Sequence, residues 1–195
     1  MTGWLLLLAL PCAAADLFLT PSSFDVSPGE RITVTMDGAA WTAAEIKDPV
    51  LIAAAGVYNL TNLRAVDGVL LADGTAKSKG TLIVAAQSLG QHSYFAKALL
   101  TCVEPGDVAR KVVGHALEIV PVALPPGGSI SIQVLLHGKP AGGVAVEIVS
   151  SGGERKKAGL SDGEGKMRIE VGAAGVYRVT ASQGPLRASL TFEAK

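Results

Sequence analysis

Three histidines are the residues of this chain best suited to bind a metal ion: His92, His115 and His137. Imidazole nitrogen is a ligand that nickel and copper accept readily. The three residues do not follow the short H-x-x-x-H or C-x-x-C spacings of contiguous metal motifs, so only the fold could bring them together. We treat them as a candidate nickel, cobalt or copper site, with Asp16 or a free α-amino group as further ligands. The alternative interpretation is three separate histidines and no cofactor.

The stretch GHALEIVP, residues 114–121, holds His115 and, three positions later, Glu118. Successive side chains of a strand point to opposite faces, so in a regular strand these two cannot bind one ion without a bend at Gly114. A helix would align them, but the run LEIVP is rich in β-branched residues and ends in proline, which disfavours a helix. We predict a strand that begins a second domain. Leu117 and Ile119 are expected in its core, Pro121 at its end and Gly114 in the preceding turn.

No catalytic motif stands out in the rest of the chain. The sequence has no G-x-S-x-G element and no histidine beside a plausible serine nucleophile, and its acidic residues are scattered. The stretch SDGEGK, residues 161–166, lacks the twelve-residue ligand pattern of a calcium loop. Asp162 is instead expected to cap the backbone amides of a turn. We predict a protein that is not an enzyme and has no catalytic residues.

The second half of the chain shows the alternation of apolar and polar residues that is typical of half-buried strands. The strand candidates are SISIQVLL, VAVEIV, KMRIEV, YRVTA and RASLTFE. The segments between them, among them PPGG, HGKPAGG and SDGEG, are rich in turn-forming residues. Six or seven short strands within roughly 80 residues favour an immunoglobulin-like antiparallel β-sandwich for residues 114–195.

The first half is less regular, but it also favours strands. The candidates are LFLT, RITVTM, PVLIAAA, TLIVAAQ and YFAKALLTC, with a turn at SPGE and a loop or helical turn at residues 42–47. We predict a second β-sandwich domain over residues 16–113. The polar segment of residues 104–114 is the expected boundary between the two domains.

The first fifteen residues, MTGWLLLLALPCAAA, are typical of a signal peptide. The apolar run of residues 4–10 is too short to cross a bilayer, which takes roughly 20 apolar residues. Ala13 to Ala15 fit the small-residue cleavage pattern, with the cut before Asp16. We therefore expect a periplasmic or secreted protein with no transmembrane segment in its mature chain. Cleavage would remove Cys12, so that Cys102 is expected to be a lone core residue.

Composition excludes a nucleic-acid partner. The chain has 17 basic and 17 acidic residues, a net charge of +0, and no stripe of basic residues. Nucleic-acid binding depends on clustered contacts to phosphates, which such a chain does not offer.

Three longer stretches occur in an order that resembles a known family: LFLTPSSFDVSPGERITV, KALLTCVEPGDVARKVVGHALEIVP, and the run from QVLLHGKPAGGVAVEI to AGVYRVTA. They are similar to secreted bacterial proteins of unknown function that are often labelled a periplasmic component of cobalt or nickel transport. The C-terminal part also resembles carboxypeptidase regulatory-like and invasin-type immunoglobulin-like modules. The resemblance covers most of the expected mature chain and implies a role in metal uptake.

This chain departs from the family in two places. Family members begin, after signal cleavage, with a histidine near an aromatic residue, whereas this chain would begin with Asp16-Leu17-Phe18-Leu19. The family's longer insertion before K-A-L is reduced here to GQHSYFAKALL. Both departures weaken the implied metal role.

We therefore expect a non-catalytic binding or scaffold protein, and two functions remain open. The first is an accessory role in cobalt or nickel uptake, with a metal transporter as partner and His92, His115 and His137 close together in the fold. The second is an interaction module of the cell envelope that binds protein or glycan without a metal. The second would favour an exposed aromatic patch, around Trp41, Tyr58 or Tyr94.

Overall fold

The structure is a computed structural model and describes residues 16–38, 40–104, 110–123, 128–150 and 154–195. Within these ranges the chain consists of strands and turns, without an α-helix. The described part of the chain accordingly contains no helix long and apolar enough to cross a membrane. The predicted fold class, all-β with immunoglobulin-like antiparallel sandwiches, is confirmed. The predicted signal peptide and Cys12 lie outside the described residues.

Sheet N is a four-stranded sheet of the N-terminal half, with the strand order β1-β3-β7-β6. Alternate residues of β3, namely Ile32, Val34 and Met36, are buried, as the alternation in RITVTM predicts. The strands of sheet N are β1 (Phe18–Pro21), β3 (Arg31–Asp37), β6 (Thr61–Val66) and β7 (Val69–Thr75).

The central sheet has nine strands and draws on both halves of the chain. Its main order is β14-β13-β16-β17-β9-β8-β4-β5, and β2 pairs with β9. The N-terminal half supplies β2 (Asp25–Val26), β4 (Ile46–Ala53), β5 (Gly56–Asn59), β8 (Gly80–Ser88) and β9 (Ser93–Cys102). The C-terminal half supplies β13 (Ala145–Val149), β14 (Arg155–Leu160), β16 (Gly175–Gln183) and β17 (Leu186–Ala194).

Sheet C belongs to the C-terminal half and has the order β10-β11-β12, with β15 also pairing with β11. Its strands are β10 (Leu117–Ala123), β11 (Ser129–Leu136), β12 (Lys139–Pro140) and β15 (Lys166–Glu170). Of the alternating positions in SISIQVLL, Ile130, Ile132 and Val134 are buried as expected. The alternation ends there, because Leu136 is only half-buried and Leu135, on the opposite face, is buried.

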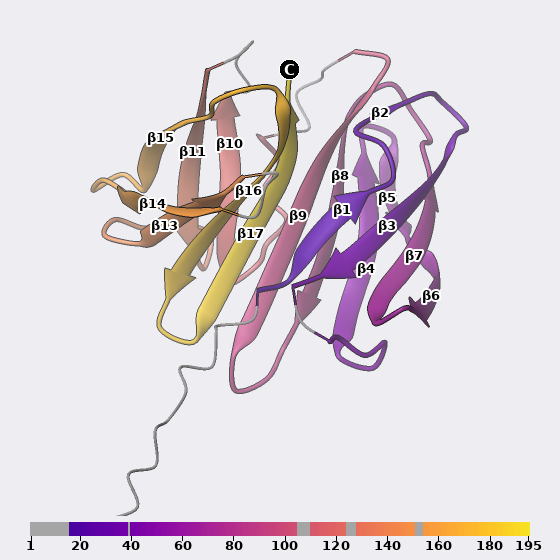
Figure 1. Ribbon diagram of the computed structural model, residues 1–195, viewed down its shortest axis with the longest axis horizontal. Coiled ribbons are helices and arrows are strands. Elements are labelled where there is room, and N and C mark those ends of the chain that lie inside the picture. The colour runs from indigo at the N-terminus through magenta and orange to yellow at the C-terminus, as the bar shows by residue number, and fades with distance from the viewer. Residues whose placement is uncertain (1–15, 39, 105–109, 124–127, 151–153) are drawn as a thin grey trace, which may run out of the picture.

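The two halves are joined where β9 and β17 run side by side as parallel neighbours, with Lys97 opposite Leu190 (Figure 1). Because alternate residues of a strand point to opposite faces, β9 can serve two cores. Phe95 and Leu99 belong to the core shared with sheet C. Ala96, Ala98 and Leu100, on the other face of β9, belong to the core under sheet N.

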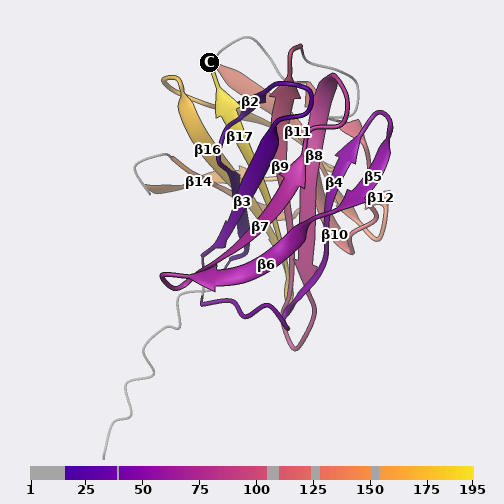
Figure 2. The ribbon, with the colours of Figure 1, turned by 90° about the vertical axis from the view of Figure 1, so that its right-hand side faces the viewer.

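Figure 2 shows β3, β7 and β6 of sheet N lying in front of the central sheet. Polar contacts add to the packing between sheet N and the C-terminal strands. Arg178 on β16 donates to Asp37 at 2.8 Å and lies over the Phe18 ring, 4.6 Å from its centroid. Ser189 on β17 donates to the backbone oxygen of Leu17. The predicted boundary between residues 16–113 and residues 114–195 stays a prediction, but the central sheet runs across it.

Several local predictions are corrected by the structure. Strand β10 does not end at Pro121 but continues to Ala123, since β10 lies at the end of the sheet C order and the missing N–H of proline is tolerated at an edge. His115 is not part of a strand, because β10 begins at Leu117. Strand β14 escaped the sequence patterns because it is exposed along its whole length and shows no alternation of burial. The strands over residues 56–75 were also missed, although Leu70 and Ala72 of β7 are buried.

Two turns behave as predicted. Glu30 donates its backbone N–H to the Ser27 oxygen at 3.0 Å, which closes the turn SPGE. Asp162 accepts the backbone N–H groups of Glu164 and Lys166 through Oδ1, at 2.9 and 2.8 Å. The capping role expected of Asp162 is therefore confirmed.

Candidate functional site

A polar groove opens on the N-terminal half of the chain. Residues of β3, β4, β5, β6 and β7 line it, together with Lys77. Its volume of about 660 Å³ lies within the range of small-molecule sites. We call it the Asp73 groove, after the buried carboxylate in its wall.

The lining of the Asp73 groove combines charged, polar and apolar side chains. Leu51 and Val57 supply apolar surface, and the half-buried Tyr58 supplies an aromatic ring. The groups that can form hydrogen bonds or carry charge are Arg31, Asn59, Thr61, Asn62, Asp73, Thr75 and Lys77. Polar and charged groups outnumber the apolar ones in this lining, which suits a polar ligand.

Asp73 is the centre of a hydrogen-bond network that fixes the groove's charged side chains. Its own side chain is 5% exposed. Arg31 donates Nη2 to Oδ2 at 2.5 Å, and Arg64 donates Nη1 to the same oxygen at 2.9 Å. Asn62 Nδ2 donates to Oδ2 at 3.2 Å, and Thr33 Oγ1 donates to Oδ1 at 3.1 Å. The two arginines are therefore held in place by one carboxylate.

The same network sets the charge of Asp73. The hydrogen bond from Arg31 holds the pKa of Asp73 well below its ordinary value. Burial of the carboxyl acts in the opposite direction, and the bonds from Arg64, Asn62 and Thr33 lower the pKa further. Asp73 is thus ionised at neutral pH, and its carboxylate accepts the hydrogen bonds of these four donors.

A β-bulge in β6 brings its donors to Asp73. The register between β6 and β7 shifts between Thr61 and Arg64, so that β6 has one residue more than its partner there. Asn62 lies at the shift with a φ of 52°, a left-handed conformation that asparagine adopts more readily than most residues. The bulge places Asn62 and Arg64 so that both donate to Asp73.

The Asp73 groove carries an excess of positive charge. The side chains of Arg31 and Arg64 are 67% and 41% exposed, although both bond to the buried Asp73. Lys77 lines the groove and is exposed. The two exposed cations of the lining, Arg31 and Lys77, therefore outnumber its one carboxylate, Asp73, and Arg64 bonds that carboxylate from beyond the lining.

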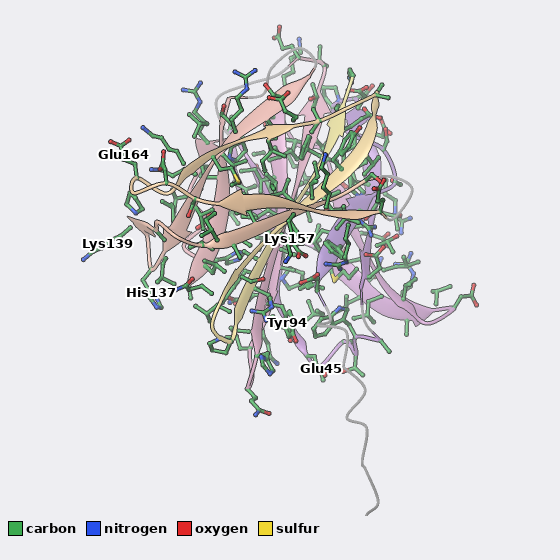
Figure 3. The ribbon with its side chains drawn as sticks, turned by 60° about the vertical axis from the view of Figure 1, so that its left-hand side comes forward. Glu45, Tyr94, His137, Lys139, Lys157 and Glu164 are labelled. Atoms are coloured by element: carbon green, nitrogen blue, oxygen red, sulfur yellow. The ribbon has the colours of Figure 1, made fainter. Side chains whose placement is uncertain are left out.

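The structure places the three predicted metal ligands in different surroundings. His115 is buried, with its ring centroid 5.2 Å from that of Phe95, whereas His92 and His137 are exposed. His137 donates its backbone N–H to the oxygen of Ala116, next to His115, but Figure 3 shows its side chain at the outer edge beside Lys139, away from Tyr94. Among the described residues, no three His, Cys, Asp or Glu side chains lie together in a way that could hold a metal ion.

The partner of Glu118 is Lys97 and not a metal-binding histidine. Lys97 Nζ donates to Glu118 Oε1 at 2.8 Å, and the two side chains are 2% and 1% exposed. The backbone N–H groups of Val113 and Gly114 also donate to the Glu118 carboxylate, at 2.7 and 3.0 Å. The stretch GHALEIVP therefore forms a buried ion pair that ties β10 to β9.

Burial and neighbouring groups together set the pKa values of Glu118 and His115. Burial alone would raise the pKa of Glu118, but Lys97 and the two amides outweigh it, so the pKa lies below its ordinary value. Burial lowers the pKa of His115 to about 4; Glu118 and Asp48 oppose this shift and Lys97 adds to it. The expectation that His115 and Glu118 lie on opposite faces of one strand does not apply, because His115 precedes β10.

The aromatic residues named from the sequence fall into two places. Trp41 and Tyr94 meet edge to face, with ring centroids 5.0 Å apart, and both pack against the core under sheet N. Tyr58 packs against the same core and lines the Asp73 groove. Apart from Tyr58, the residues of the groove were not singled out by the sequence, because Arg31, Asn62 and Asp73 are far apart along the chain and no motif links them.

Comparison with known families gives one match. The family described as "Domain of unknown function (DUF4198)" matches residues 50–184. This range includes most of the groove and the whole of GHALEIVP. No curated protein matches the chain.

The solved structures similar to this chain include the following three. The D0-D1 domain of intimin is 14% identical, with 92% of this chain and 97% of that chain covered and a TM-score of 0.29. The Yersinia pseudotuberculosis adhesin InvE is 11% identical, with 93% and 58% covered and a TM-score of 0.32. A fragment of Escherichia coli alpha-2-macroglobulin is 14% identical, with 90% and 63% covered and a TM-score of 0.32. At these scores the likeness supports no argument about function.

Proposed function

We propose that this chain, which belongs to the DUF4198 family, is a non-catalytic binding module of the cell envelope and holds a polar ligand in the Asp73 groove. The observation that carries the proposal is the network around Asp73. A buried carboxylate fixes Arg31 and Arg64 beside a cavity large enough for a small molecule. Preorganised polar groups lower the entropic cost of binding, which is the advantage of building them into a sheet. The signal-peptide pattern of residues 1–15 supports a periplasmic or secreted location.

Filling the groove tests this proposal. Asn59 lies on the edge strand β5, is exposed and lines the groove, so Asn59→Trp adds a large ring without disturbing either core. A library of sugars, organic acids, amino acids and short peptides is screened by thermal shift, since a ligand that binds the folded state raises Tm. We expect library members that raise the Tm of the unaltered protein and leave that of Asn59→Trp unchanged.

The matched control is Val66→Trp, because Val66 is 40% exposed, lies on β6 and does not line the groove. The Val66→Trp variant should respond to ligands as the unaltered protein does. A function in the Asp73 groove is contradicted if no library member raises the Tm. It is also contradicted if the ligands raise the Tm of Asn59→Trp as much as that of the unaltered protein.

An accessory role in cobalt or nickel uptake is the alternative that the family resemblance implies. Among the residues that the structure describes, His115 belongs to no group of three His, Cys, Asp or Glu side chains that could hold a metal ion. We therefore expect calorimetric titration with nickel, cobalt and copper to give the same result for the unaltered protein and for His115→Ala. Micromolar binding that is lost in His115→Ala, or in His92→Ala combined with His137→Ala, would instead favour metal uptake.

A further inference from the structure

We infer that the ligand of the Asp73 groove is a saccharide carrying a carboxylate, an inference that rests on the function proposed above. The first argument is charge. Arg31 and Lys77 line the groove and outnumber its one carboxylate, Asp73, which is already bonded to Arg31 and to Arg64 beyond the lining. An anionic ligand would meet cations and no uncompensated negative charge. The planar guanidinium of Arg31, fixed by Asp73 and 67% exposed, suits a carboxylate.

The second argument is the set of uncharged polar groups beside these cations. Asn59, Thr61, Asn62 and Thr75 all line the groove. Amide and hydroxyl side chains offer donors and acceptors at once. A ring of hydroxyl groups, each of which both donates and accepts, matches such a lining better than a simple carboxylic acid does.

The third argument is the apolar part of the groove. Tyr58 lines the groove and is half-buried against the core, which fixes its ring. A tyrosine ring supplies a flat apolar surface, and its hydroxyl group forms hydrogen bonds at one end. The C–H face of a pyranose ring fits such a surface while its hydroxyl edge meets the asparagines and threonines. An acidic peptide shares the carboxylates but not the hydroxyl ring, and it is the competing ligand in the test.

The test is calorimetry on the full chain with three probes: trigalacturonate, the neutral maltotriose and the peptide triglutamate. Lys77→Gln removes one groove cation, and Lys79→Gln is its matched control, since Lys79 is also exposed and does not line the groove. We expect trigalacturonate to bind best, and Lys77→Gln to weaken it about fivefold, the effect of one exposed ion pair of about 1 kcal/mol. Lys79→Gln should leave the Kd unchanged. Raising the ionic strength should weaken trigalacturonate binding as well.

Each other outcome overturns the inference in a distinguishable way. Equal binding of maltotriose, or trigalacturonate binding that Lys77→Gln does not change, would remove the carboxylate from the recognition. If triglutamate binds and trigalacturonate does not, the ligand class is an acidic peptide and not a saccharide, and the groove is still the binding site. If none of the three probes binds while the library screen finds a ligand that Asn59→Trp blocks, the inference fails and the proposed function stands. If neither calorimetry nor the library screen finds a ligand, both the saccharide inference and the proposed function are contradicted.

Discussion

Replacing Glu118 with leucine is expected to lower the free energy of unfolding by about 3–5 kcal/mol, the loss typical of breaking a buried ion pair. Lys97 Nζ would then lie 2% exposed without its carboxylate, and the backbone N–H groups of Val113 and Gly114 would lose their acceptor. Both effects leave buried polar groups without a hydrogen-bond partner. The free-energy cost of such groups exceeds the net stabilisation that the removed hydrogen bonds gave. Urea unfolding followed by fluorescence measures the change.

The double variant Lys97→Met with Glu118→Leu separates the two causes. Removing the ammonium as well should restore about 2 kcal/mol, because no charge then stays buried. Recovery should be incomplete, since the amides of Val113 and Gly114 still lack Glu118 as their acceptor. The single variants Glu118→Leu and Lys97→Met are measured beside it. If the loss of unfolding free energy in the double variant equals the sum of the two single losses, Lys97 and Glu118 are not coupled.

The exposed pair Arg168 and Glu170 provides the comparison. Its atoms lie 3.2 Å apart, but the two side chains are 71% and 76% exposed. We expect Glu170→Leu to change the free energy of unfolding by about 0.5 kcal/mol or less, because solvent screens such pairs.

Acid is expected to destabilise the protein through His115. Burial lowers the pKa of His115 from 6.5 to about 4 in the folded state, so the unfolded chain takes up the proton first. The stability that His115 contributes is present above 6.5 and is lost as the pH falls from 6.5 towards about 4. Between pH 7 and pH 5 this amounts to about 2 kcal/mol, at about 1.4 kcal/mol for each unit of pKa difference.

Urea unfolding at a series of pH values checks this. The variant His115→Leu keeps an apolar side chain near Phe95 and should remove most of the loss between pH 7 and pH 5. His137→Gln, at an exposed histidine, should retain it. Glu118 also loses stabilising interactions in acid, but only as the pH falls through 4.5 and below, because its folded pKa lies below that value. A pH dependence unchanged in His115→Leu would show that another group carries the loss.

Most strands that face one core could be predicted from the chain, and strands without such a face could not. Strand β7 is the exception, since its Leu70 and Ala72 are buried and the strand was still missed. RITVTM alternates cleanly because one face of its strand is buried. SISIQVLL does so from Ile130 to Val134, whereas Ser129 and Leu135 on its other face are also buried. Strand β14 is exposed on both faces, and β6 is mostly exposed, so neither carries the alternation on which the prediction depends. Conversely, β9 is buried on both faces, and YFAKALLTC was recognised only as an apolar run.

The candidate sites show the same limit. His115 and Glu118 were considered as a pair because they are neighbours in the sequence, yet the partner of Glu118 lies 21 residues away, at Lys97. The groove was missed because Arg31 and Asp73 are 42 residues apart. Neither contact leaves a spacing that a motif could express, since β-sheet partners are set by strand order.

By itself, the sequence determined the class of the fold: alternating apolar residues and frequent turn residues commit most of the chain to antiparallel strands with one buried face. It also determined local details such as the Asp162 turn, which depend only on neighbouring residues. The tertiary structure alone decided that β9 and β17 join the two halves in one sheet, that Lys97 meets Glu118, and that Asp73 gathers its arginines. The physical reason is that these contacts depend on which strands lie side by side. Neighbouring strands pair through backbone hydrogen bonds, which any side chains allow, so a single sequence does not reveal the pairing.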